Sequence, residues 1–269
     1  MNNQNGFLPG MLTILLCCYA SIIHGQGAEL EVVTSDSFYF ESPALFKCDI
    51  QFPGDYHTEK PLPLVISLHG GGGSYETFKN TWGHFEDPQF ILATPQAPYK
   101  WLMGDQIGYD WSAWLTGDLK VMEKALELTI PYIENLIQTL SKRYNIDEVY
   151  LMGFSQGSII TQIAGINMHE YLNGLIILSG PHLFQTAQPP LIDSFELDWP
   201  AEETIRSANN LKIFIAHGRS DARIAIERAR KSKDIYEGYG YQTTLYEFEG
   251  GHEINPGAMK KIERWIEGY

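Results

Sequence analysis

Short apolar runs rich in β-branched residues recur along the chain and are separated by polar or glycine-containing stretches. Each run is about five residues long, which is typical of buried strands. They occupy residues 64–68, 90–94, 149–152, 175–178, 211–216 and 244–248. We expect six strands at these positions.

Helical periodicity appears between several of these runs. Ile133, Leu136, Ile137 and Leu140 follow one another at three- and four-residue steps, with polar residues between them. Strands that alternate with helices predict an α/β fold, a mostly parallel central sheet with helices on both faces. Pro131 interrupts the segment 118–144, so the pattern allows either a kinked helix or a turn that leads into a helix.

Three segments lie outside this alternation. Residues 32–52 alternate apolar and polar positions and predict one or two antiparallel edge strands. Residues 99–114 lack a clean period and predict a structured loop. Residues 183–210 are polar and proline-containing, which is typical of a lid or substrate loop, although a plain insertion has the same pattern.

The N-terminus carries an apolar run over residues 11–23, and the first charged side chain is Glu29. The run is too short for a transmembrane anchor but has the length of a signal-peptide core. We therefore expect a signal peptide at 1–27, cleaved after Gly25 or Gly27, an exported (secreted or periplasmic) protein, and a single catalytic domain at 28–269. An apolar arm of an intracellular protein, or lipid attachment at Cys17 or Cys18, are the alternatives.

Composition narrows the classes of partner. The 269 residues carry a net charge of −14, which repels nucleic acids and anionic membranes. After signal cleavage Cys48 alone remains, so an internal disulfide is excluded. No cysteine or histidine pair has metal-ligand spacing, and we expect no metal and no cofactor.

A nucleophile motif follows the run at 149–152. Gly153-Phe154-Ser155-Gln156-Gly157 fits the pattern G-x-S-x-G and precedes a helical stretch, giving the strand, sharp turn and helix that expose a serine hydroxyl. The glycines permit the strained turn and the close approach of neighbouring backbone. We expect Ser155 to be a nucleophile.

A serine hydroxyl needs a histidine base and a carboxylate that orients it. In this fold the acid and the base follow Ser155 in that order, on loops after late strands. Asp221 follows the run at 211–216, and His252 follows the run at 244–248. We therefore predict a triad of Ser155, Asp221 and His252.

A glycine-rich loop follows the first predicted strand, at His69-Gly70-Gly71-Gly72-Gly73. Its exposed N–H groups suit an oxyanion hole, for which we expect Gly71, or Gly72, together with the N–H of Gln156. His69 and His217 are expected to hydrogen-bond loop backbone. Trp101, Trp111 and Trp114 are candidates for a substrate-binding wall, although such aromatic residues often belong to the core.

These motifs together resemble the phospholipase/carboxylesterase branch of the α/β-hydrolase superfamily, which includes acyl-protein thioesterases. The resemblance extends from about residue 63 to the C-terminus, and its motifs are Leu-His-Gly at 68–70, the tryptophan stretch at 109–118, the pentapeptide at 153–157, Leu-Ser-Gly at 178–180, His-Gly-x-x-Asp at 217–221 and Gly-Gly-His at 250–252. It implies hydrolysis of carboxylic esters or thioesters by Ser155, Asp221 and His252.

The chain departs from the family pattern in three places. The glycines at 71–73 are closer to feruloyl-esterase and polyester-depolymerase-like secreted enzymes, Ser158 replaces a glycine, and Ala222-Arg223-Ile224 replaces an apolar-proline step. The acyl group and the alcohol are thereby left open. We expect a serine carboxylesterase acting on a small-molecule or polymer-linked ester; a phospholipase, an acyl thioesterase, a peptidase and a catalytically silent glycan- or lipid-binding protein remain alternatives.

Overall fold

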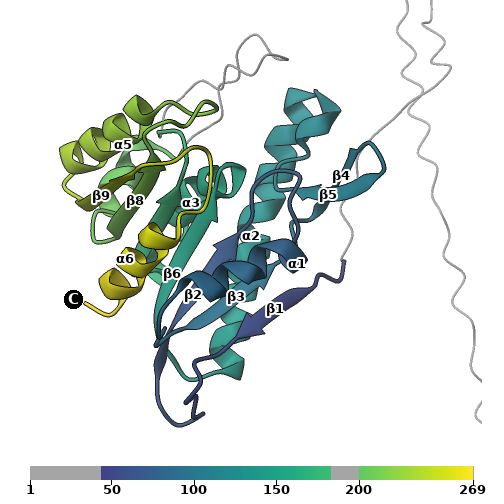
Figure 1. Cartoon of the computed structure of the whole chain (residues 1–269). Coiled ribbons are helices and arrows are strands. Elements are labelled where there is room, and N and C mark those ends of the chain that lie inside the picture. The colour runs from purple at the N-terminus through teal and green to yellow at the C-terminus, as the bar shows by residue number, and fades with distance from the viewer. Residues whose placement is uncertain (1–43, 183–199, 269) are drawn as a thin grey trace, which may run out of the picture. The chain divides into compact units, whose positions relative to one another are not determined.

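The computed structural model describes residues 44–182 and 200–268 (Figure 1). The expected signal peptide at 1–27, residues 32–43 of the expected edge-strand region and residues 183–199 of the expected loop lie outside the described residues. In the part of the loop that is described, residues 202–207 form the short helix α4 (Glu202–Ser207). None of the described helices is both long enough and apolar enough to span a bilayer.

The described residues form a seven-stranded sheet in the order β1-β3-β2-β6-β7-β8-β9. Its strands are β1 (Cys48–Gln51), β2 (Leu62–Leu68), β3 (Ile91–Pro95), β6 (Ile146–Phe154), β7 (Gly174–Leu178), β8 (Lys212–Gly218) and β9 (Gln242–Phe248). β1 is antiparallel to β3, and the other neighbours are parallel. The six predicted strands and an antiparallel edge strand are confirmed.

Alternate residues of the inner strands β2, β3, β6, β7 and β8 pack into two separate cores because successive side chains point to opposite faces of a sheet. Leu64 and Ile66 of β2 join the core beneath α2 (Leu119–Arg143), α3 (Gln156–Asn167) and α5 (Ile226–Gly238). Val65 joins the core beneath α6 (Pro256–Ile266). All three β2 side chains are fully buried, each contributing roughly 1.5–3 kcal/mol. This double burial explains why the inner strands appear in the sequence as continuous apolar runs.

α2 runs without a break through Pro131, so the alternative of a turn that leads into a helix is wrong for this segment. Asp118 caps its N-terminus by accepting hydrogen bonds from the N–H groups of Lys120 (2.9 Å) and Val121 (3.4 Å). Ile133 and Ile137 lie in the core, as their spacing predicts.

The prediction of a structured loop at 99–114 is wrong over most of its length. β4 (Tyr99–Met103) and β5 (Gln106–Asp110) form an antiparallel hairpin outside the central sheet, which lies beside one end of α2 in Figure 1. Its two-residue turn contains Gly104 at a φ of +61°. The cross-strand pair Leu102 and Ile107 is exposed, and so the hairpin lacks the clean apolar alternation of a half-buried strand.

Candidate active site

The carboxyl ends of four parallel strands lead into the loops that carry the predicted site. The glycine-rich loop follows β2, Ser155 follows β6, Asp221 follows β8 and His252 follows β9. Parallel strands present their carboxyl ends at one edge of a sheet, which is where open α/β folds bind ligands. Residues from four distant parts of the sequence are thereby brought together.

Ser155 lies in a sharp turn between β6 and α3. Its backbone adopts a φ of 52° and a ψ of −115°, which few L-residues tolerate. The Ser155 N–H donates to Leu178 O on the neighbouring strand (2.9 Å), and Gly153 and Gly157 approach so closely that a Cβ on Gly153 would overlap Gly157 O. The strained turn presents the hydroxyl at the edge of the sheet.

The three predicted side chains form a hydrogen-bonded chain. Ser155 Oγ lies 2.9 Å from His252 Nε2, and His252 Nδ1 lies 2.7 Å from Asp221 Oδ2. An ionised carboxylate only accepts hydrogen bonds, so Nδ1 carries the proton and Nε2 faces the hydroxyl as an acceptor. Such an arrangement can transfer the hydroxyl proton to the imidazole.

Asp221 is held as an anion. Its side chain is inaccessible to solvent, and burial by itself would raise its pKa. Hydrogen bonds from the N–H groups of Ile224 (2.9 Å) and Arg223 (2.8 Å), and from His252, outweigh burial and lower the pKa of the carboxyl group. The charge opposite His252 is therefore fixed before any reaction.

His217 and His69 hydrogen-bond loop backbone, as the sequence predicts. His217 Nε2 lies 2.7 Å from Ile224 O and 3.3 Å from Asp221 Oδ2, and burial lowers the pKa of its imidazole. His69 Nδ1 donates to Gly70 O (2.8 Å) while its Nε2 accepts from the Ala97 N–H (3.2 Å). Burial lowers the pKa of His69 to about 4. Both imidazoles are neutral at pH 7.

The expectation that Gly72 could supply an N–H group to the oxyanion hole is wrong. The Gly72 N–H donates to Tyr109 O of β5 (2.9 Å), so Gly72 is not available to an oxyanion. Among the described residues, the N–H groups of Gly71 and Gln156 donate no hydrogen bond. A Cβ at Gly71 would lie 3.2 Å from Gln156 Oε1, which puts these two residues side by side.

The three candidate tryptophans have different surroundings. Trp111 is completely buried, with its indole N–H donating to His69 O (2.8 Å), so the expectation that it contacts substrate is wrong. Trp101 is half-buried on β4, and its ring lies 2.9 Å from the position of a Cβ on Gly71. Trp114 is also half-buried, and its N–H donates to Asp110 Oδ2 (2.7 Å).

Sequence reasoning missed Asp110 and the side chain of Gln156. Asp110 accepts from the N–H of Ser112 (2.7 Å) and from Gln156 Nε2 (2.8 Å). An aspartate that caps the N–H two residues ahead is a recognised turn signal, which Asp110-Trp111-Ser112 offers. Nothing in the sequence indicates its contact with residue 156.

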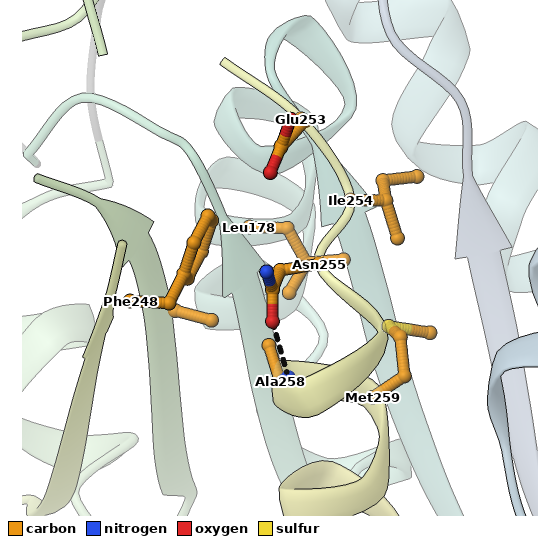
Figure 2. Close-up of a pocket in the computed structure, with 8 residues that line it drawn as sticks. Leu178, Phe248, Glu253, Ile254, Asn255, Ala258 and Met259 are labelled. Carbon is orange, nitrogen blue, oxygen red and sulfur yellow. Dashed lines mark hydrogen bonds between the residues drawn. The ribbon is translucent and has the colours of Figure 1, made fainter. Parts of the chain in front are cut away.

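The loop that carries His252 is anchored by the start of α6. Figure 2 shows Asn255 above the first turn of this helix, where its Oδ1 accepts from the Ala258 N–H (3.1 Å). Pro256 occupies the first helical turn, where the missing N–H costs no hydrogen bond. Phe248, on the last strand, and Met259, on α6, line the small pocket next to this loop (Figure 2) and belong to the second core.

Within the described ranges, no group of three histidine, cysteine or acidic side chains is arranged to hold a metal ion. The hydrogen-bonded chain of serine, histidine and aspartate beside two free N–H groups suits acyl transfer.

Comparison with known proteins agrees with the fold and identifies the family. The phospholipase/carboxylesterase family model matches residues 55–268, and the chain belongs to this family of α/β hydrolases that act on esters and thioesters. It is 24% identical to acyl-protein thioesterase 1 of Gibberella zeae over 217 residues, which cover 75% of this chain and 88% of the relative.

Solved structures share the fold at low identity. Acyl-protein thioesterase 2 of Zea mays matches with a TM-score of 0.59 and 15% identity over 82% of this chain and 98% of its own. A ferulic acid esterase of Anaeromyces mucronatus, solved with ferulic acid, matches with a TM-score of 0.61 and 16% identity over 82% of this chain and 84% of its own.

Proposed function

We propose that the protein is a serine hydrolase that cleaves carboxylic esters through an acyl-enzyme formed on Ser155. The observation that carries the proposal is the chain from Ser155 Oγ through His252 to Asp221, with separations of 2.9 and 2.7 Å. Both distances lie within hydrogen-bond reach, as proton transfer requires.

The reaction begins when Ser155 Oγ attacks the ester carbonyl carbon while its proton passes to His252 Nε2. The carbonyl electrons move to oxygen, and the N–H groups of Gly71 and Gln156 stabilise the resulting anion. Asp221 stabilises the imidazolium. When the intermediate collapses, His252 donates this proton to the leaving alcohol. Water then attacks the acyl-enzyme while His252 takes one of its protons, and His252 passes that proton to Ser155 Oγ as the carboxylic acid is released.

The substrate that we propose is a carboxylic ester in which one group is aromatic or extended. The half-buried ring of Trp101 lies against Gly71, whose N–H group is proposed to bind the carbonyl oxygen, and Trp114 stays a candidate for the same wall. An acyl thioester is the second candidate, which the fungal thioesterase relative supports. The ester can be free or attached to a polymer.

The test is hydrolysis of a p-nitrophenyl ester series from acetate to palmitate, together with the matching thioesters. We expect Ser155→Ala to lose at least about 10⁴-fold in kcat with little change in melting temperature. A short-chain optimum supports the carboxylesterase, and a long-chain or thioester optimum supports the acyl thioesterase or phospholipase. If no substrate reacts and a fluorophosphonate fails to label Ser155, the catalytic proposal is wrong and the binding-protein alternative takes its place.

We also propose that residues 1–27 direct export. The apolar run at 11–23 before the first charged residue supports this. N-terminal sequencing of the protein made in its own cells should give a start at Gln26 or Ala28. A retained Met1 would contradict export by cleavage.

A further inference from the structure

The Gln156 side chain, next to the nucleophile, ties the turn at Ser155 to the β4–β5 hairpin. Its Nε2 donates to Asp110 Oδ1 (2.8 Å) and to Ser112 Oγ (3.2 Å), and its Oε1 accepts from the Trp111 N–H (3.3 Å). All three partners lie at the end of β5 or directly after it. Both ends of the amide are therefore committed to the hairpin.

Asp110 determines which way this amide points. The Asp110 residue is 1% exposed, and its carboxylate accepts from Gln156 Nε2, from the N–H groups of Ser112 and Trp114 (both 2.7 Å) and from Ser112 Oγ (3.3 Å). These donors are uncharged. A carboxylate has no proton to donate, so only the NH₂ end of Gln156 can face it. The Oε1 end is then fixed toward Trp111.

The same hairpin also holds the glycine-rich loop. The Gly72 N–H donates to Tyr109 O, and the Tyr109 N–H donates to Gly73 O, both at 2.9 Å. Gly108 lies so close that a Cβ there would overlap the Gly72 backbone. One strand, β5, thus contacts the two loops that supply the Gly71 and Gln156 N–H groups.

We propose that Asp110 and the Gln156 side chain are positioning residues, which hold the N–H groups of Gly71 and Gln156 at the separation that an oxyanion requires. This inference rests on the proposed function. Donors that are fixed beforehand stabilise developing charge without reorganising during the reaction, so a loss of this link lowers kcat more than it raises KM.

The test compares Asp110→Asn and Gln156→Ala, singly and together, with the intact protein on its preferred p-nitrophenyl ester. Gln156→Ala keeps its backbone N–H. We expect each single variant to lose about 10- to 100-fold in kcat, with KM within about threefold. Because both act through one link, the double variant should lose about as much as the worse single variant. Asp105→Asn, the same change at the exposed hairpin turn, is the matched control and should retain full activity.

A second readout separates positioning from a general loss of structure. Replacing the carbonyl oxygen of the ester by sulfur weakens hydrogen bonds to the oxyanion position, so the intact protein should prefer the oxygen ester strongly. This preference should fall in Asp110→Asn, measured well below its melting temperature. If the wild type is active and Asp110→Asn has the same kcat and the same preference for the oxygen ester, this inference is overturned while the proposed function stands. A wild type that neither turns over esters nor labels with fluorophosphonate overturns the proposed function instead.

Discussion

Ser155 combines a functional position with a strained backbone. A φ of 52° with a ψ of −115° costs a non-glycine residue on the order of 1–3 kcal/mol, and the surrounding strands and Gly157 hold it there. Glycine adopts this conformation freely but loses more chain entropy on folding. A strain energy above about 1 kcal/mol outweighs the entropy cost of a glycine at this position.

We therefore predict that Ser155→Gly is more stable than Ser155→Ala by about 1 kcal/mol. Both variants lack the hydroxyl, so they differ in backbone strain and chain entropy. Urea denaturation of the two proteins measures the difference. Equal stabilities, or a less stable glycine variant, would mean that the turn stores less strain than its dihedral angles indicate.

His69 gives the fold a dependence on pH. Its pKa of about 4 in the folded protein lies below the ordinary value of 6.5, so the unfolded chain binds the proton more readily. The stability that the neutral His69 imidazole contributes is fully present above about pH 6.5 and is lost as the pH drops toward 4. By linkage, this one group lowers the free energy of unfolding by roughly 2 to 3 kcal/mol between pH 7.5 and 4.5.

We predict that His69→Asn, which keeps a donor for Gly70 O, is less stable than the wild type at pH 7.5. The difference should shrink by roughly 2 kcal/mol at pH 4.5, because the variant has no imidazole to protonate. Urea unfolding of both proteins at the two pH values provides the measurement, and the carboxylates common to both cancel. Parallel pH curves would exclude His69 as the source.

The β4–β5 hairpin is attached to the glycine-rich loop by backbone contacts that leave no room for side chains. A Cβ on Gly108 would overlap the carbonyl group of Gly72, whose N–H bonds to the neighbouring Tyr109. Gly108→Ala should therefore push the hairpin away and cost about 1–3 kcal/mol of stability. Gly54→Ala and Gly83→Ala, where nothing lies within 4 Å, are the controls. If urea denaturation gives Gly108→Ala the same free energy of unfolding as the two controls, the hairpin is not held tightly against the glycine-rich loop.

Five of the six predicted strands (β2, β3, β6, β7 and β8) were predictable from sequence because they are buried on both faces, and the edge strand β9 was predictable from its short β-rich run. Asp221 and His252 were predictable because each follows a predicted strand. The hairpin was not, since its exposed Leu102 and Ile107 conceal the alternation, although the two-residue turn Gly104-Asp105 was a usable signal. Trp111 was misassigned because the sequence does not distinguish a core aromatic residue from one in a binding wall. The contact of Asp110 with Gln156 spans 46 residues and depends on the three-dimensional fold.

At the scale of the whole molecule, the net charge of −14 produces a negative field that acts on any charged substrate approaching the site. Salt screens such a field over about 10 Å at 0.1 M. For an active esterase we predict that kcat/KM for an anionic aryl ester, such as a p-nitrophenyl hemisuccinate, rises about two- to fivefold between 10 and 300 mM NaCl. A neutral ester of equal length should stay constant and a cationic one should fall. If kcat/KM for the anionic ester instead falls as salt is added, the local potential at Ser155 is positive despite the negative net charge of the chain. Basic residues around the site then determine which charged substrates it prefers.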